Sequence, residues 1–237
     1  MTEHTTRAFD TDLEDLARRI AEMGELDRRQ IGDAIEALGR RDLVLAERTI
    51  ANDDRVDALQ RDIEESAVVT IARRQPMAVD LREIVGALRI SIDLERIGDL
   101  AENVAKRVVL STGEFHANEV MLQLQRMVQL VLEQLAEALE SYERRDVAKA
   151  LEVWRKDEEI DALNNSLFRK LLTYMMENPS NITYCTHLLF CAKNFERMGD
   201  HVTNIAEDVY YIVQGHPLSK ERPKADVTSR QTLPLAI

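Results

Sequence analysis

Glycine and proline are scarce in this chain. Eight Gly and five Pro among 237 residues make up about half of their usual share in globular proteins. Because these residues end helices and form turns, their scarcity predicts long elements joined by few turns. The β-branched residues do not alternate with polar residues over any run of five or more, which excludes strands. We therefore expect helices alone.

The chain also lacks the features of membrane and nucleic-acid-binding proteins. Its longest stretch without Asp, Glu, Lys or Arg, residues 178–192, has 15 residues, whereas a membrane-spanning helix needs roughly 20. The N-terminal residues have neither a basic start nor an apolar run, so they do not form a secretory signal. The net charge of −12, with no basic block, repels phosphates and anionic lipids. We predict a cytoplasmic protein with no membrane insertion and no nucleic-acid partner.

The apolar residues, 45% of the chain, recur with the 3.6-residue period of helices and suffice for a large core. The two cysteines, Cys185 and Cys191, have neither disulfide nor zinc spacing and are expected in that core. The expected fold is all-α, with six helices near residues 8–39, 43–74, 78–111, 117–144, 147–177 and 182–215.

The two halves of the chain repeat one another. Residues 40–59 match residues 144–163 at eight of twenty positions with an offset of 104. Residues 95–105 match residues 196–206 at six of eleven positions with an offset of 101. We expect two three-helix bundles. The expected boundaries are 8–113 for the first repeat, 117–215 for the second and 216–237 for a C-terminal tail.

The repeated residues are mostly polar and stand four positions apart, which places them on one face of each helix. In the first repeat they are Asp53, Asp57, Glu95, Asp99 and Asn103; in the second they are Asp157, Asp161, Glu196, Asp200 and Asn204. Carboxylates at this spacing repel one another, and carboxylate and amide oxygens are the ligands that hard cations prefer. We interpret each set as a metal site.

Charged faces that pair with arginine are the plain alternative, and at 31% charge they arise often by chance. The duplication of the pattern favours the metal sites. So do Gly98 and Gly199, which occupy matching helix positions where glycine permits a close approach. His201 follows Asp200 and could add a ligand in the second repeat, although it could equally be a surface residue.

The segments ERIGDLAEN, ERMGDHVTN and RRQPMAVDLR resemble the PhoU family of phosphate-uptake regulators over about residues 8–215. The resemblance implies two three-helix bundles and a homodimer. It also implies multinuclear metal clusters, iron first and zinc, manganese or magnesium as alternatives, on the ten residues named above. It implies a negative regulator of phosphate uptake and of the phosphate-starvation response. Its partners would be the ATPase of the phosphate ABC transporter (PstB) and the sensor histidine kinase PhoR.

Two functions stay open at this point: a metal-bearing adaptor without turnover, and a metal-dependent hydrolase or oxidase. No Glu has a His three residues later, as di-iron carboxylate enzymes require, and no nucleophile or Arg cluster accompanies the carboxylates. We therefore favour the adaptor and expect no enzyme. The RRQPMAVDLR stretch, which ends in Arg82, appears only in the first repeat, so if it is a partner surface the two halves are not equivalent in binding.

Overall fold

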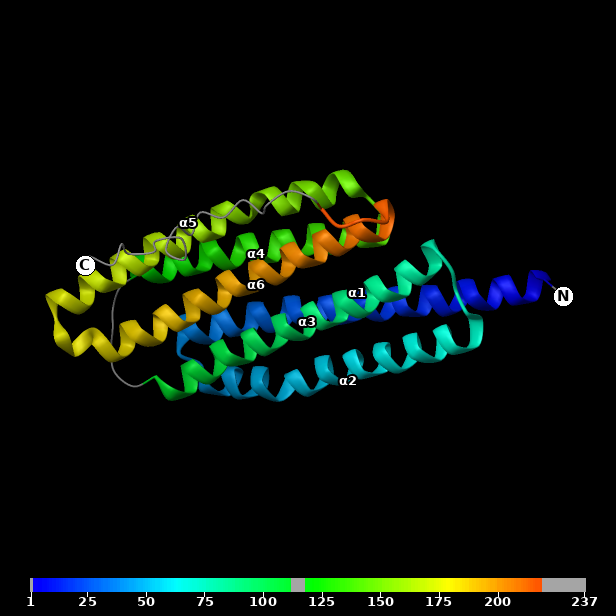
Figure 1. The fold of residues 1–237 in the computed structure, drawn as a ribbon. Helices are drawn as coiled ribbons and strands as arrows, with labels where there is room; N and C mark the ends of the chain where they lie inside the picture. The colour runs from blue at the N-terminus through cyan, green and yellow to red at the C-terminus, as the bar shows by residue number, and fades with distance from the viewer. Residues whose placement is uncertain (1, 112–117, 219–237) are drawn as a thin grey trace, which may run out of the picture.

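The structure, a computed structural model, describes residues 2–111 and 118–218, except for the side chains of residues 2–8 and of Asp157. The described part is helical throughout and has no strand, which confirms the all-α fold (Figure 1). The elements are α1 (Thr2–Arg40), α2 (Leu43–Arg74), α3 (Val79–Leu110), α4 (Asn118–Arg144), α5 (Val147–Glu177), a 3₁₀ turn η1 (Pro179–Asn181) and α6 (Ile182–Gln214). The first helix begins at Thr2 rather than near residue 8. The expected tail lies mostly outside the described residues.

The first turn of each repeat has the same chemistry. Arg41 and Arg145 both adopt φ +54°, in the left-handed region that ends a helix. The following residues, Asp42 and Asp146, are N-caps whose carboxylates accept hydrogen bonds from backbone N–H groups three residues later, at 3.0 and 3.1 Å. The repeated Arg-Arg-Asp sequence therefore stops one helix and starts the next.

The six helices form two three-helix units packed side by side (Figure 1). The first unit contains α1, α2 and α3, and the second contains α4, α5 and α6. The units meet along α3 and α6 and, on the other side, along α1 and α4. Because α3 and α6 pack against helices of both units, their buried stripes are wide. Cys185 and Cys191 are buried on α6 and not bonded to each other, as expected.

Two glycines allow the units to approach closely. A Cβ atom on Gly86 of α3 would lie 2.3 Å from Ile212 Cδ1 of α6. On the other side, a Cβ atom on Gly24 of α1 would lie 2.4 Å from Leu139 Cδ1 of α4. Both distances are shorter than any non-bonded carbon–carbon contact, so a Cβ atom at either position would displace the side chain of Ile212 or Leu139.

Arg82, at the end of RRQPMAVDLR, contacts the second unit within the chain. Its side chain is half-buried, and its Nε donates to the carbonyl of Ile212 in the last turn of α6, at 3.3 Å. Gly215, which ends α6 with φ +79°, lies against the same guanidinium. Arg82 therefore caps α6 and joins the two units, because a cation is favourable at a helix C-terminus.

Candidate metal centre

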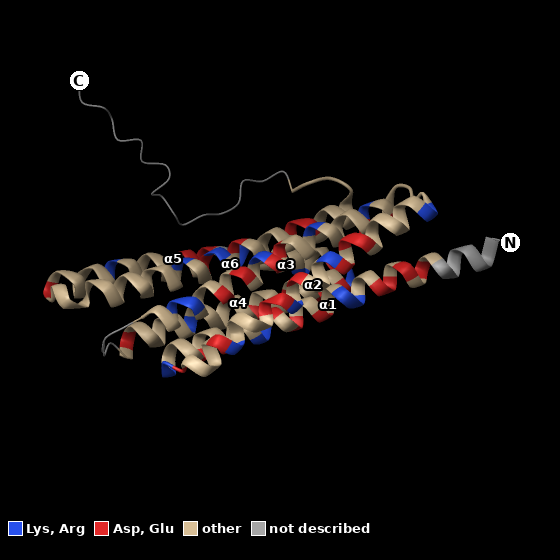
Figure 2. Cartoon of the chain, turned by 90° about the horizontal axis from the view of Figure 1, so that it is seen from below, with Lys and Arg blue, Asp and Glu red and all other residues tan. Residues whose placement is uncertain are grey.

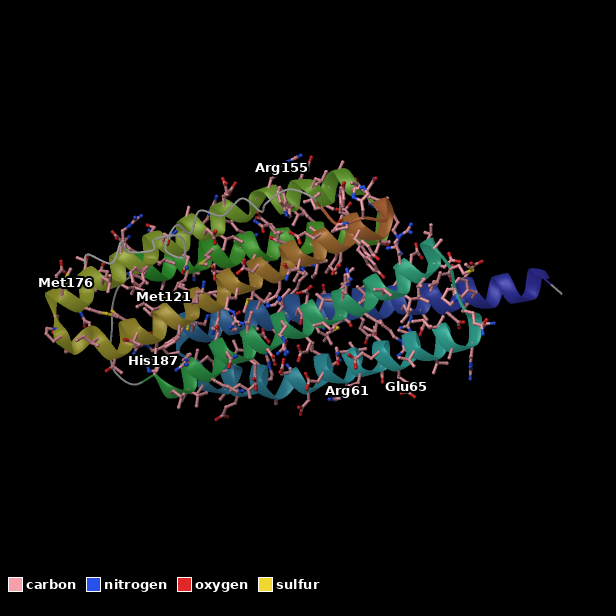
Figure 3. The ribbon with its side chains drawn as sticks, in the orientation of Figure 1. Arg61, Glu65, Met121, Arg155, Met176 and His187 are labelled. Atoms are coloured by element: carbon pink, nitrogen blue, oxygen red, sulfur yellow. The ribbon has the colours of Figure 1, made fainter. Side chains whose placement is uncertain are left out.

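The first acidic cluster consists of Asp27, Asp53, Asp57, Glu95, Asp99 and Glu102. It lies where α2 and α3 face each other, and Asp27 reaches it from α1. Asp57 and Asp99 both repel the carboxylates of Asp53 and Glu95. The structure thus brings together four of the five residues predicted in the first repeat. Side chains on the outer face of α2, such as Arg61 and Glu65, point into solvent (Figure 3).

Two polar residues of α1, Asp27 and Gln30, also reach the first acidic cluster, and neither was predicted from the sequence. Asp27 is 0% exposed and Gln30 is 4% exposed. A Cβ atom on Gly98 of α3 would lie 3.0 Å from Asp53 Oδ1 and 3.2 Å from Gln30 Oε1. It would lie 3.3 Å from Asp27 Oδ1. Oxygen atoms from α1 and α2 therefore converge on the glycine that the repeat singled out.

Burial and mutual repulsion raise the pKa values of these carboxyl groups. Burial raises the pKa of Asp53 to about 6, and repulsion by Glu102 is the next cause. The pKa of Asp27 lies well above its usual range because the group is fully buried and faces Asp53 and Glu95. Burial, with repulsion from Asp99, also raises the pKa of Glu95. In the absence of a cation, the cluster retains protons at a pH where isolated carboxyl groups have lost them.

The basic residues near the first cluster lie at its outer edge. Arg96 pairs with Glu95 at 3.4 Å and with Asp99 at 3.1 Å, and its side chain is 54% exposed. Arg61 approaches Asp57 at 3.8 Å, and Lys106 pairs with Glu102. These exposed pairs contribute little stability. Within the described part of the chain, neither Asp27 nor Asp53 forms an ion pair with Lys or Arg.

Asn103 does not extend the first cluster as predicted. It is exposed on α3, and the acidic group that acts most strongly on Asp53 is Glu102, one position earlier. The step of four from Asp99 fails here because 3.6 residues per turn shift the face slightly with each step. Asn103 is therefore no part of the buried face.

The second acidic cluster consists of Asp161, Glu196 and Asp200. Asp161 and Glu196 are buried, at 5% and 7% exposure, and both Asp161 and Asp200 repel Glu196. Burial raises the pKa of Glu196, although Lys193 Nζ pairs with it at 2.6 Å and opposes the shift. The side chain of the fourth predicted residue, Asp157, lies outside the described residues. Three of the five predicted residues are thus brought together.

Asn204 and His201 point away from the second cluster toward the first unit. Asn204 Nδ2 donates to Asp93 Oδ1 of α3 at 3.1 Å. His201 Nδ1 lies 2.7 Å from the same oxygen. Both side chains thus belong to the polar contact between α3 and α6. The prediction placed Asn204 on the correct helix but with the wrong neighbour.

The donor atoms fit a hard divalent cation by type. Carboxylate and amide oxygens are the usual ligands of Mg²⁺, Mn²⁺ and Ca²⁺. Among the described residues, the buried oxygens of Asp27 and Gln30 Oε1 accept no hydrogen bond. Among the described side chains, no three His, Cys, Asp or Glu residues gather closely enough to hold one ion by themselves. A cation here would therefore also need the amide of Gln30, water or a small movement of the carboxylates.

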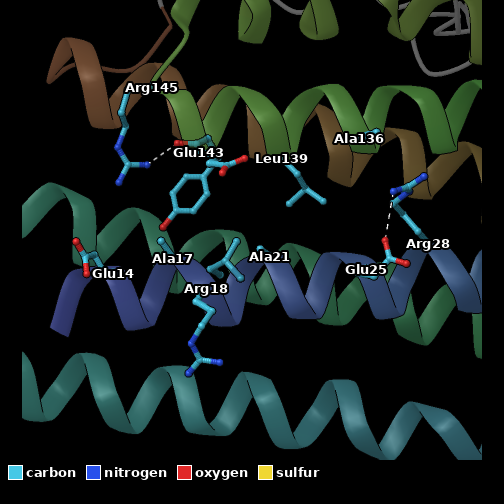
Figure 4. Close-up of a pocket in the computed structure, with 12 residues that line it drawn as sticks. Glu14, Ala17, Arg18, Ala21, Glu25, Arg28, Ala136, Leu139, Glu143 and Arg145 are labelled. Carbon is cyan, nitrogen blue, oxygen red and sulfur yellow. Dashed lines mark hydrogen bonds and ion pairs between the residues drawn. The ribbon is translucent and has the colours of Figure 1, made fainter. Parts of the chain in front are cut away.

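Basic and acidic residues are interspersed along the helices (Figure 2). An open groove of about 560 Å³ lies between α1 and α4, with an apolar floor that includes Ala17, Ala21 and Leu139 (Figure 4). Charged pairs such as Arg28 and Glu25, 3.3 Å apart, line its rim. No residue of either acidic cluster lines this groove, so it is separate from the candidate metal centre.

No helix in the described ranges is both long and apolar enough to cross a membrane.

Comparison with known proteins places the chain in a family. The family model for the PhoU domain matches residues 20–108 and again residues 124–209. A phosphate-specific transport system accessory protein PhoU homolog of Rhizobium meliloti is 53% identical over 95% of both chains. A homolog of the same name from Caulobacter vibrioides is 46% identical over 97% of this chain and 100% of the relative.

Solved structures agree with the sequence comparison. The crystal structure of PhoU from Pseudomonas aeruginosa has a TM-score of 0.83 and 37% identity, and the match covers 88% of this chain and 100% of that one. PhoU from Streptococcus pneumoniae gives the same TM-score at 29% identity, with 90% of this chain and 100% of that chain covered. The chain therefore belongs to the PhoU family.

Proposed function

We propose that this protein is a non-enzymatic regulator of phosphate uptake. It restrains the phosphate ABC transporter through the ATPase PstB and keeps the histidine kinase PhoR from activating phosphate-starvation genes while phosphate is abundant. It acts in the cytoplasm as a homodimer. The observation that carries this proposal is the full-length similarity to relatives named as accessory proteins of the phosphate-specific transport system. Those names give no support to the alternative of a hydrolase or oxidase.

The surface of the second unit supports an adaptor role. Large apolar side chains are exposed in the second half of α5 and the first half of α6: Phe168 is 50% exposed, Met176 is 78% exposed and Phe190 is 49% exposed. Met176 stands at the end of the bundle (Figure 3). Large exposed apolar side chains are common where proteins bind partners. This end of the bundle is therefore a candidate contact for the transporter or the kinase.

The regulator would hold metal at the two acidic clusters. Iron is the first expectation, and zinc, manganese and magnesium are the alternatives. Glu95 and Asp99, with Asp53 and Asp57 opposite, would hold the multinuclear cluster of the first unit. Glu196 and Asp200, with Asp157 and Asp161 of the facing helix, would hold that of the second. When bound, the metal would supply positive charge that offsets the mutual repulsion of these carboxylates. The helices would then pack more firmly.

Deletion of the protein tests the regulatory role directly. In the deletion strain, a reporter of a phosphate-starvation gene should be active at high phosphate, because the kinase has lost its restraint. A plasmid copy of the wild-type chain should restore repression. Normal repression in the deletion strain would refute the function and leave the fold unaffected.

Binding experiments test the partners. Purified PstB and the cytoplasmic part of PhoR should each bind at low salt. Binding should weaken as salt rises, because the net charge of −12 favours basic partner surfaces and salt screens that attraction. Absence of binding to both at low salt would contradict the adaptor role.

A further inference from the structure

Asp27 is a fully buried carboxylate on a mostly apolar face of α1. It lies on the buried stripe of α1, between Met23 and Ile31, and is 0% exposed. Among the described residues, neither of its carboxylate oxygens has a hydrogen-bond partner, and the same holds for Oε1 of Gln30. An unpaired buried carboxyl group is costly, so such groups normally have a proton, a donor or a metal beside them.

Two of these unpaired oxygens and one oxygen of Asp53 face one small space. Asp27 Oδ1, Gln30 Oε1 and Asp53 Oδ1 all lie within 3.3 Å of the point where Gly98 would carry a Cβ atom. Gln30 Nε2 donates a hydrogen bond to Asp53 Oδ1 at 3.4 Å, so the side chains of α1 and α2 are in contact here. Glycine at position 98 leaves this space free, and any larger residue would fill it.

We propose that Asp27, Gln30 and Asp53 form a buried site for one hard divalent cation beside Gly98, in the first unit only. This inference rests on the proposed metal binding of the protein. It adds α1 to the ligand-bearing helices and makes the two units unequal. A cation with two carboxylates and one amide would complete its coordination with water, as Mg²⁺ and Mn²⁺ commonly do.

The second unit keeps two of the three residues of this inner site and lacks the third: with the offset of 104, Gln134 and Asp157 stand at the positions of Gln30 and Asp53. With the offset of 104, Val131 stands at the position of Asp27 and is 0% exposed. With the offset of 101, Thr203 replaces Glu102 and Lys193 replaces Ile92. Lys193 pairs with Glu196 and so supplies positive charge from within the chain. The second unit therefore needs an added cation less than the first unit does.

Mn²⁺ binding to the full-length, metal-free protein tests the inference. Free Mn²⁺ would be counted by electron paramagnetic resonance during titration, and the melting temperature would be followed with and without Mn²⁺. The test variant is Asp27→Val, which copies Val131 of the second unit. The matched control is Asp54→Asn, because Asp54 is exposed on α2 next to the site.

Asp27→Val should lose one bound Mn²⁺ or bind it at least about tenfold more weakly, whereas Asp54→Asn should match the wild type. Without Mn²⁺ the Asp27→Val variant should melt at a higher temperature than the wild type, and Mn²⁺ should raise that temperature less. Should Asp27→Val fold poorly, Asp27→Asn gives the same comparison with nearly unchanged shape.

Identical Mn²⁺ titrations of wild type and Asp27→Val would overturn the inference and show Asp27 to be a protonated core residue. In that case the outer carboxylates still account for the bound metal. The double variant Glu95→Gln/Asp99→Asn checks this, since it should then remove the Mn²⁺ that Asp27→Val leaves. No Mn²⁺ bound by the wild type would overturn both the inference and the proposed metal binding, while the deletion strain tests regulation separately.

Discussion

Because α3 and α6 approach each other closely at Gly86, we expect Gly86→Ala to destabilise the folded protein. The added methyl group would lie 2.3 Å from Cδ1 and 2.4 Å from Cγ1 of Ile212, which is 1% exposed and packed in the core. Overpacking of this kind costs about 1 to 3 kcal/mol, and contacts this short belong at the upper end. Alanine in place of a helical glycine returns about 1 kcal/mol. The free energy of unfolding should therefore fall by about 2 kcal/mol.

Gly32→Ala is the matched control for this substitution. Gly32 lies inside α1, and no atom outside its own helix lies within 4 Å of the position of its Cβ. It should therefore show the helical gain of about 1 kcal/mol without the clash. Urea unfolding of both variants measures the difference, and unchanged slopes would show that the midpoints report stability.

A double variant identifies the cause of the loss. Ile212→Ala alone should cost about 2 to 5 kcal/mol because it leaves a cavity. In Gly86→Ala/Ile212→Ala, the new methyl group occupies part of that cavity. The double variant should therefore lose less stability than the sum of the two single losses, by about 1 kcal/mol or more. A Gly86→Ala protein as stable as the wild type, or losses that simply add, would refute the close contact between the units.

Two further predictions concern charge. The pKa of Asp53, raised to about 6, means that the folded metal-free protein binds this proton more tightly than the unfolded chain. Stability should therefore fall as pH rises from about 4 to about 6. The shift of about two units corresponds to at most about 3 kcal/mol, less after solvent screening, and Asp53→Asn should flatten the profile from urea unfolding. Arg82→Ala should lose about 1 to 2 kcal/mol of stability with the α6 cap, whereas Arg73→Ala, an exposed change in the same stretch, should not.

The helices and most of their ends could be predicted from the sequence because local chemistry determines them. The N-caps Asp42 and Asp146 and the proline at position 76 each act within a few residues of a helix end. The duplicated carboxylates could also be predicted, since the repeat marks them and a step of four keeps them on one face.

The contribution of α1 to the site could not be predicted in the same way. The repeat directs attention to residues present in both halves, and Asp27 is absent from the second half, where Val131 stands. The sequence marks Asp27 only as a single Asp within an apolar helical stripe, and a comparison of the two halves does not reveal such an unmatched residue. Asn204 shows the other limit. Periodicity gives the face of a helix, but α6 has neighbours in both units, and only the packing shows that Asn204 meets Asp93.

The carboxylates of each acidic cluster repel one another, and the two units differ in the groups that offset this repulsion. In the second, Lys193 pairs with Glu196 and Val131 stands where the first unit has a carboxylate, so part of the repulsion is offset or absent. In the first, Asp27 and Asp53 have no such internal cation, and relief must come from bound protons or a bound cation. A ligand that binds the folded state alone stabilises it in proportion to its occupancy. The stability of the first unit should therefore follow cation concentration and pH, and that of the second should follow them less.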